Sequence, residues 1–277
     1  MTKRAAVVND LSSFGRCSLT AYIAVLSAMG VQTCPLPTAV LSAQSEFERH
    51  FCRDLTEDIP RYIQSWSENR ERFDCICTGY FAGGKQPGYA LELIDKFRKG
   101  CTVLVDPVMG DDGKLYPAYD GEARKKMKRL VDAADIITPN LTELCLLADE
   151  DYFSLISKSS GVSCLEAVEK IAKRFSKNRG VIVTGIQIGD EICNLAVQNE
   201  DTKLIRRRKT GERFSGTGDL FSAAVCGCIM NGKSIWEAAE TAADFISASV
   251  ADTINEPHDP LYGVNFEKNL HKLTEVK

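Results

Sequence analysis

The most informative residues of this chain are two glycines that flank a threonine and precede an aspartate, in the run SGTGD at positions 215–219. The glycines allow a tight backbone turn, and the apolar run that follows predicts a helix over 220–230. Free backbone N–H groups and the positive end of the helix dipole then coincide, and such a place attracts anions. Asp219 is suited to take a proton from a hydroxyl that attacks a phosphate. The run indicates phosphoryl transfer to an alcohol, although threonine and aspartate are also ordinary helix caps.

Two further motifs place acidic residues after apolar strands. Asp106 opens the run DPVMGDDG at 106–113, where an acid can hold magnesium beside nucleotide phosphates or simply form a turn rich in aspartate and glycine. Glu143 ends the run TPNLTE at 138–143, which suits a helix entry. A second acid at the same sheet edge suits a hydrated magnesium ion, and the same acid also favours the helix dipole.

A polar run also follows the first apolar segment of the chain. Residues 8–18 read VNDLSSFGRCS and contain a glycine turn. Their polar groups suit the edge of a small acceptor molecule, and a capped turn between a strand and a helix explains them equally well.

Short β-branched runs alternate with helical patterns along the chain. Strands are predicted at 5–8, 31–35, 75–78, 101–105, 136–137 and 181–184, with an antiparallel pair at 192–197 and 203–207. Helices are predicted at 19–29, 55–66, 89–98, 122–133, 141–147, 165–174, 220–230 and 235–250. This alternation predicts an α/β fold with a mainly parallel sheet and helices on both faces. Ligands of such sheets bind at the carboxyl ends of the strands.

The organisation of the chain predicts a single domain over residues 1–277, because no linker rich in Pro, Gly or Ser divides it. The polar segment 38–57 is interpreted as a flap over the site or as a surface connection. The polar tail at 255–277 is predicted to be a peripheral end.

Composition excludes several classes of partner. The net charge is −4 and there is no long basic run, which argues against nucleic acid. No apolar stretch is long enough to span a membrane. Eleven cysteines are scattered without a Cys-x-x-Cys pair or a histidine cluster, so no zinc site is predicted. Free thiols and the lack of a signal-peptide pattern at the N-terminus predict a cytoplasmic protein.

Taken in order, these motifs resemble those of the ribokinase-like superfamily, and within it the vitamin B6 kinases that phosphorylate pyridoxal, pyridoxine or pyridoxamine. The resemblance covers nearly the whole chain and is carried by residues 9–20, 78–80, 106–111, 138–143, 183–185 and 216–219. It implies a single-domain three-layer sandwich and a homodimer. It also implies ATP as co-substrate, Mg²⁺ and, in addition, K⁺.

The resemblance also implies a role for each matched residue. Asp219 would be the base, and the anion hole would consist of Gly216, Thr217 and Gly218. Magnesium would be organised by Asp106 and Glu143, and the nucleotide would be bound by Thr138, Thr184 and Gly185. The acceptor pocket would be lined by Asp10, Ser12, Ser45 and Tyr80, with Ser45 as the counterpart of a threonine that contacts the pyridine ring.

Two departures from the family bear on the acceptor. The loop at 42–47 lacks the histidine that B6 kinases commonly carry there. Many pyridoxal kinases have serine where Asp10 falls, and an aspartate resembles the related hydroxymethylpyrimidine kinases. The alternative acceptors are therefore hydroxymethylpyrimidine or another small, sugar-like alcohol.

Two alternatives belong to other classes of protein. A dinucleotide-dependent oxidoreductase would need Gly-x-Gly-x-x-Gly after the first strand, whereas residues 9–16 contain one glycine. A non-catalytic nucleotide-binding protein would be expected to have lost the base, and Asp219 is present.

Overall fold

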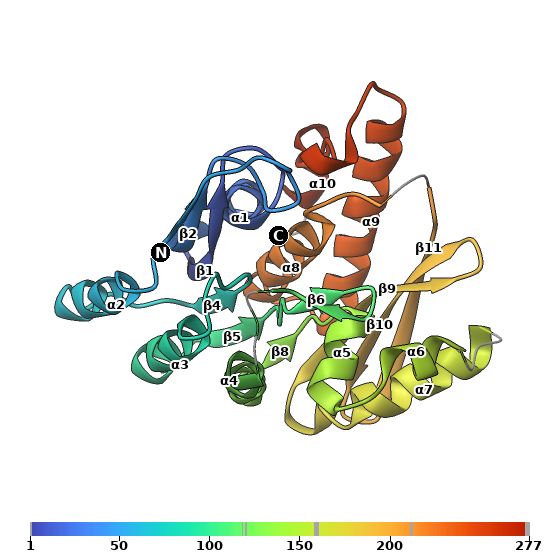
Figure 1. The fold of residues 1–277 in the computed structure, drawn as a ribbon, viewed down its shortest axis with the longest axis horizontal. Helices are drawn as coiled ribbons and strands as arrows, with labels where there is room; N and C mark the ends of the chain where they lie inside the picture. The colour runs from blue at the N-terminus through green and yellow to red at the C-terminus, as the bar shows by residue number, and fades with distance from the viewer. Residues whose placement is uncertain (1, 118, 120, 158–160, 211–212, 275–277) are drawn as a thin grey trace.

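The computed structural model describes residues 2–117, 119, 121–157, 161–210 and 213–274. Its centre is a nine-stranded sheet with the order β11-β10-β9-β8-β5-β4-β1-β2-β3 (Figure 1). The strands are β1 (Arg4–Ser12), β2 (Gln32–Leu41), β3 (Cys52–Asp54), β4 (Cys75–Thr78), β5 (Thr102–Val105), β8 (Ile136–Ile137), β9 (Gly180–Ile188), β10 (Glu191–Gln198) and β11 (Asp201–Arg208). A separate hairpin consists of β6 (Gly110–Asp111) and β7 (Lys114–Leu115).

Pairing in the sheet is parallel from β2 to β9 and antiparallel at both ends. The predicted α/β fold with a mainly parallel sheet is therefore confirmed, as is the antiparallel pair of β10 and β11. The first strand is longer than predicted: β1 continues past its apolar residues to Ser12, because the polar residues there keep pairing with β2. The polar end of β1 is consequently part of the sheet edge.

Helices cover both faces of the sheet. They are α1 (Ser18–Ala28), α2 (Ile59–Glu68), α3 (Gln86–Phe97), α4 (Gly121–Asp132), α5 (Leu141–Ala148), α6 (Tyr152–Ser157), α7 (Gly161–Lys173), α8 (Thr217–Met230), α9 (Ile235–Ile254) and α10 (His271–Thr274). Short 3-10 turns occupy Ser176–Asn178, Pro260–Tyr262 and Glu267–Asn269. Among the described residues, none of the helices combines the length and the apolar character that crossing a lipid bilayer requires.

Two hydrophobic clusters form the core, one on each face. On β1, Ala6 and Val8 join the cluster beneath α2, α3, α4, α5 and α7, whereas Ala5 and Val7 join the cluster with α1, α8 and α9. This alternation follows from the period of two in a strand. Both faces of the central strands are buried, as is usual in parallel sheets.

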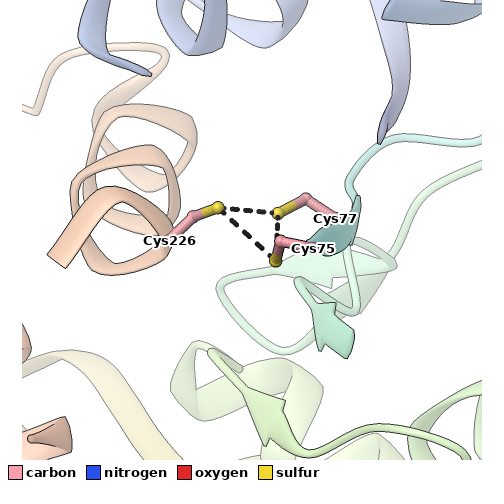
Figure 2. Close-up of side chains that lie close together, drawn as sticks. All are labelled: Cys75, Cys77 and Cys226. Carbon is pink, nitrogen blue, oxygen red and sulfur yellow. Dashed lines mark hydrogen bonds between the residues drawn. The ribbon is translucent and has the colours of Figure 1, made fainter. Parts of the chain in front are cut away.

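The core beneath α8 gathers cysteines that are far apart in the sequence. The thiols of Cys75 and Cys77 on β4 and of Cys226 on α8 lie within 4.8 Å of one another, and the Cys77 and Cys226 Sγ atoms are 3.1 Å apart (Figure 2). All three residues are at most 1% exposed. The cysteines are therefore clustered in space although they are scattered in the sequence, and we assign these three to the core as small, weakly hydrogen-bonding apolar groups.

The tail differs from its prediction, whereas the segment 38–57 agrees with the reading as a flap over the site, since Gln44, Ser45 and Glu46 line a cavity described below. The segment 38–57 contains the end of β2 and the short strand β3, joined by a loop. The tail is not peripheral, because Val264, Phe266 and Leu273 are at most 4% exposed and pack into the cluster with α1, α8 and α9. The apolar residues of 255–277 are interspersed with polar and charged ones, and the helical turns there are only three or four residues long, so no extended periodic pattern indicated their burial.

Candidate functional site

A cavity of about 630 Å³ opens at the carboxyl edge of the sheet, where β1, β4, β5 and β8 end. Every predicted site residue except Gly185 lines it. A second cavity of about 640 Å³ lies beside it toward β9, β10 and β11, and Gly185 lines that one. Thr184, Thr217 and Gly218 line both cavities. The start of α8 is therefore the junction of two neighbouring cavities, each large enough for a small molecule.

The backbone of the SGTGD run has the predicted anion-binding form. Helix α8 begins at Thr217, directly after Gly216, whose φ is +78°. A Cβ atom at Gly216 would lie 2.3 Å from the Arg16 carbonyl oxygen, so this position accepts no side chain. The first N–H groups of α8 are free of helical partners and face the junction, where they and the helix dipole favour an anion.

Asp219 lies in the first turn of α8, and a buried amide orients it. The Asn9 side chain donates from Nδ2 to Asp219 Oδ1 at 2.9 Å. The Asn9 Oδ1 atom accepts from the backbone N–H groups of Asp10 and Tyr80, each at 2.9 Å. Burial raises the pKa of Asp219 to about 6, against the lowering effect of its hydrogen bonds. Such a carboxyl group is mostly ionised at neutral pH and is a stronger base than an exposed aspartate.

A chain of three side chains connects β5, β8 and α8. Ser222 donates to Asp106 Oδ2 at 2.8 Å, and the hydroxyl groups of Ser222 and Thr138 are 2.9 Å apart. Burial, and secondarily the nearby Asp219 carboxylate, raises the pKa of Asp106 to about 8. The predicted residues Asp106 and Thr138 are thus joined through Ser222. This serine lies one helical turn beyond Asp219, and the sequence analysis did not single it out.

Glu143 is both the N3 residue of a capping box and part of the site. It accepts from the backbone N–H of Asn140 through Oε2 at 2.8 Å and from that of Met109 through Oε1 at 3.1 Å. Burial, followed by the neighbouring Asp106 carboxylate, raises its pKa well above the usual range. Both readings of Glu143 from the sequence therefore apply, because the same carboxylate caps α5 and lines the cavity.

The set of carboxylates fits a magnesium ion. Asp106 and Glu143 offer hard oxygen ligands at one cavity wall. Burial, and secondarily a neighbouring carboxylate, raises the pKa of each, and a bound divalent cation would favour their ionised forms. Because both Glu143 oxygens already accept backbone hydrogen bonds, the fit is best for an ion that keeps several of its waters.

The predicted acceptor residues lie on the β1, β2 and β4 side of the cavity. Ser12 donates to Asp10 Oδ2 at 2.7 Å, and both residues are at most 4% exposed. Burial raises the pKa of Asp10, against hydrogen bonds from Ser18 and Ser12 that lower it. Tyr80 and the exposed Ser45 complete this part of the wall.

The predicted nucleotide residues lie on the other side. The Thr184 N–H donates to the Pro139 carbonyl at 2.9 Å, which ties β9 to the segment after β8. Gly185 donates to Asn194 Oδ1 at 3.2 Å and has a φ of +69°.

Asn9, Ser222 and Arg213 are site residues to which sequence reasoning gave no role. Asn9 lies in the polar run at 8–18, and Ser222 lies in the apolar run after SGTGD. Only the folded chain brings Asn9 to Asp219 and Ser222 to Asp106.

The fold and the arrangement of the site define a class, the phosphotransferases of the ribokinase-like type. Residues 13–261 match the family described as phosphomethylpyrimidine kinase, so the chain belongs to that family. It is accordingly an ATP-dependent phosphotransferase, and the resemblance stated from the motifs is confirmed. Gly216, Asp219, Asp106 and Glu143 lie within the matched stretch, and Asp10 lies three residues before it.

Individual proteins are similar over most of the chain. A protein of Bacteroides thetaiotaomicron VPI-5482, described as a candidate phosphomethylpyrimidine kinase and crystallised in one form with pyridoxal, is 34% identical in that form. Its TM-score is 0.91, and the match covers 99% of this chain and 96% of that one. The pyridoxal kinase of Lactobacillus plantarum is 26% identical with a TM-score of 0.87, over 99% and 97% of the two chains.

A relative with a broader name matches over a shorter stretch. The pyridoxine/pyridoxal/pyridoxamine kinase of Bordetella avium (strain 197N) is 28% identical over 187 residues, which are 64% of this chain and 60% of the relative.

Proposed function

We propose that this protein transfers the γ-phosphoryl group of ATP to the hydroxymethyl group of a vitamin B6 vitamer: pyridoxal, pyridoxine or pyridoxamine. The observation that carries the proposal is the position of Asp219, a carboxylate with a pKa of about 6 that lines the first cavity from the first turn of α8, directly after the residues where the two cavities meet. The similar Bacteroides protein that was crystallised with pyridoxal supports this class of acceptor.

In the proposed mechanism Asp219 takes the proton of the acceptor hydroxyl as the oxygen attacks phosphorus in line. Asn9 holds the carboxylate by a 2.9 Å hydrogen bond, so its direction is set before the acceptor binds. The backbone N–H groups of Gly216, Thr217 and Gly218 form an anion hole for the transferring group. Catalysis then arises mainly from positioning and from stabilisation of charge.

Asp106 and Glu143 would hold magnesium, which neutralises phosphate charge when it is bound. Thr138, Thr184 and Gly185 would contact the nucleotide. We propose K⁺ as an additional activating ion, to be tested by replacing potassium salts with sodium salts in the assay.

The acceptor would lie between Asp10, Ser12 and Tyr80, with Ser45 against its ring. Asp10 also favours a second candidate, the phosphorylation of hydroxymethylpyrimidine, because a buried carboxyl group can accept a hydrogen bond from an amino group on the ring. The name of the family is consistent with that alternative.

The deciding experiment measures the consumption of magnesium-ATP by the purified protein with pyridoxal, pyridoxine, pyridoxamine, hydroxymethylpyrimidine and several sugars. We expect kcat/KM to be at least tenfold higher for one B6 vitamer than for any other compound. A preference for hydroxymethylpyrimidine would transfer the proposal to the alternative, and turnover of none of these compounds would overturn it.

The assignment of the base is tested by Asp219→Asn. This variant keeps the hydrogen bond from Asn9 but cannot accept a proton, so we expect kcat to fall by about 10² to 10⁴, in the range that general base catalysis contributes. Nucleotide binding, measured by calorimetry, should stay within about twofold. Asp132→Asn, an exposed position on α4 outside both cavities, is the matched control. Turnover of Asp219→Asn near the wild-type rate would contradict the assignment.

We further propose that the protein is a single-domain homodimer and acts in the cytoplasm. All eleven cysteines are free thiols, which supports a reducing compartment. Sedimentation of the purified protein would test the oligomeric state, and localisation of a tagged copy would test the compartment.

A further inference from the structure

We call the cavity of about 630 Å³ the acceptor cavity, because Asp10, Ser12 and Tyr80 line it. Its charged side chains are mostly acidic. Six carboxylic acids of the described chain line this cavity, namely Asp10, Glu46, Asp106, Asp111, Glu143 and Asp219. Among the described residues that line it, Arg213 is the one cation. A phosphoryl group that enters this cavity is repelled by those acids that are ionised, Asp219 among them, and the N–H groups at the start of α8 carry only partial charge. The position of Arg213 therefore matters for where a phosphate can sit.

Arg213 lies where the two cavities meet. It lines both of them, as do Thr217 and Gly218 at the start of α8. It stands three residues before Gly216, so its backbone leads directly into the anion-binding turn. The other cations at the second cavity, Arg207, Arg208 and Lys209, do not line the acceptor cavity. Arg213 is thus placed for the terminal phosphate of a nucleotide.

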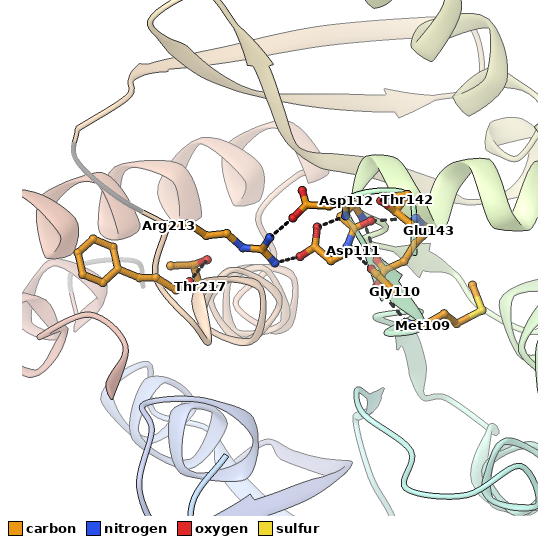
Figure 3. Close-up of polar contacts among 11 residues, drawn as sticks. Met109, Gly110, Asp111, Asp112, Thr142, Glu143, Arg213 and Thr217 are labelled. Carbon is orange, nitrogen blue, oxygen red and sulfur yellow. Dashed lines mark hydrogen bonds and ion pairs between the residues drawn. The ribbon is translucent and has the colours of Figure 1, made fainter. Parts of the chain in front are cut away.

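Two carboxylates bind the guanidinium group of Arg213, and their oxygens occupy the places that phosphate oxygens could take. Its Nη2 pairs with Asp111, and its Nη1 donates to Asp112 Oδ2 at 2.7 Å (Figure 3). Both acids stand at the turn of the hairpin between β6 and β7. Carboxylate and phosphate oxygens both match the planar fork of arginine, so one group can replace the other.

The hairpin is fixed more firmly than the arginine. Gly113 N–H donates to Thr142 Oγ1 at 2.9 Å, and Asn140 Nδ2 donates to the Gly110 carbonyl at 2.9 Å. The Arg213 side chain, in contrast, is 56% exposed. Exposed ion pairs contribute little to stability, so the exchange of a carboxylate for a phosphate has a low cost.

We propose that Arg213 binds the terminal phosphate of the nucleotide, and that Asp111 and Asp112 hold its guanidinium group at the junction until that phosphate replaces them. This inference rests on the proposed function for the identity of the nucleotide. It assigns a phosphate-binding role to a residue outside the SGTGD run, and it makes Asp112 a competitor of the phosphate for the guanidinium group.

The test compares the affinities of two nucleotides that differ by one phosphate. Calorimetry measures the Kd of magnesium-ADP and of the β,γ-imido analogue of magnesium-ATP, for the wild type, Arg213→Gln and Arg213→Lys. We expect Arg213→Gln to weaken binding of the triphosphate analogue about tenfold or more and that of ADP by less than threefold. Arg213→Lys should lie between, because it keeps the charge but loses the fork. Arg206→Gln, which breaks an exposed ion pair with Glu191 outside both cavities, should change neither Kd.

Asp112→Asn tests the competition between carboxylate and phosphate from the other side. The removal of one carboxylate that competes for Arg213 should tighten binding of the triphosphate analogue severalfold and leave ADP binding unchanged. This variant also carries the test if Arg213→Gln does not fold.

Equal losses of affinity for both nucleotides in Arg213→Gln, or unchanged binding of the triphosphate analogue, would overturn the inference. Weaker or unchanged triphosphate binding in Asp112→Asn would do the same. Because these measurements need no acceptor, they are independent of the substrate panel. If no B6 vitamer is phosphorylated, the proposed function fails while the role of Arg213 is still decided.

Discussion

At the scale of single residues, Asn9 is the residue on which the geometry of the base depends. It is fully buried and uses its amide in three directions, toward Asp219, Asp10 and Tyr80. Proton transfer requires Asp219 to be ionised, so activity follows the pKa that this environment sets. Because that pKa is about 6, kcat/KM should fall about tenfold per pH unit below pH 6 and level off above it.

We predict that Asn9→Ala moves this acidic limb to higher pH. The hydrogen bond from Asn9 stabilises the ionised carboxylate, and its loss raises the pKa of Asp219 further. Two backbone N–H groups also lose their acceptor, which should cost about 1–3 kcal/mol in the free energy of unfolding. Asn231→Ala, which removes a hydrogen bond to the Met29 carbonyl outside both cavities, should lose stability without moving the limb. An unchanged pH profile in Asn9→Ala would show that Asn9 does not act on the base.

The buried position of Asp106 in the site lowers the stability of the fold when its carboxyl group is ionised. Its folded-state pKa of about 8 lies above the ordinary value of 3.8, so the folded state binds its proton more tightly than the unfolded state does. The stability that this gives is complete below about pH 4 and is lost progressively as the pH rises through about 8. At alkaline pH the folded state therefore contains an ionised, buried Asp106 carboxylate, which costs stability.

We predict that Asp106→Asn stabilises the fold relative to the wild type, by an amount that grows about 1–3 kcal/mol between pH 5.5 and pH 9. Activity with magnesium-ATP should fall, because the amide cannot replace the carboxylate beside the ion. Urea unfolding at several pH values measures the effect. Ser222→Ala should act in the opposite direction, since it removes a hydrogen bond that lowers the Asp106 pKa. A stability difference that does not depend on pH would refute the linkage.

At the scale of elements, the first turn of α8 joins the site to the fold. Gly216 has a φ of +78°, and a Cβ there meets the Arg16 carbonyl at 2.3 Å, whereas a Cβ at Gly218 meets nothing within 4 Å. We predict that Gly216→Ala lowers the free energy of unfolding by at least about 1–2 kcal/mol and reduces kcat more than tenfold. Gly218→Ala should unfold at the wild-type temperature. Thermal unfolding and kcat of the two variants check this, and a Gly216→Ala variant that matches the wild type in both would contradict it.

The elements themselves could be predicted where the sequence has a strong period. The antiparallel pair of β10 and β11 and the short strand β8 occur at nearly the predicted residues. In contrast, β2 continues to Leu41 through Pro35 and Pro37, where a shorter strand was predicted. Over both prolines β2 pairs only with β1, so their missing N–H groups leave no ladder bond unmade on the open side. Local propensity cannot reveal which side of a strand stays open.

The residues of the site also fall into a group that the sequence could predict and a group that it could not. Residues at strand ends, such as Asp106 and Tyr80, could be predicted because a parallel sheet brings its carboxyl ends to one edge. The partners that orient them could not. Ser222 stands in the middle of an apolar helical run, and nothing in its neighbours in sequence indicates Asp106, which is 116 residues away. The β6–β7 hairpin that holds Arg213 was too short to produce a strand pattern.

At the scale of the whole molecule, the two-sided burial of the sheet controls the chemistry of the thiols. Eight of the eleven cysteines are buried, Cys34 and Cys164 are half-buried, and Cys52 is exposed on the edge strand β3. Burial raises the pKa of several of them, including Cys17 and Cys101, and so lowers their thiolate fraction. We predict that a thiol reagent labels Cys52 quickly, Cys34 and Cys164 slowly, and the rest only in denaturant. Mass spectrometry of timed samples checks this, and Cys52→Ser should abolish the fast phase. Fast labelling of Cys226 in the native protein would contradict the arrangement.

The hydrogen bond between Asn9 and Asp219 also sets an order of events in biosynthesis. The two residues are 210 positions apart, so at about 5–20 residues per second the base leaves the ribosome about 10–40 s after the amide that orients it. During that interval β1, β2 and β4 can pair, but the side of β1 that carries Ala5 and Val7 has no α8 to cover it. The nascent chain therefore exposes part of its core for as long as it lacks its base, and a chain that stops early is both inactive and prone to aggregate.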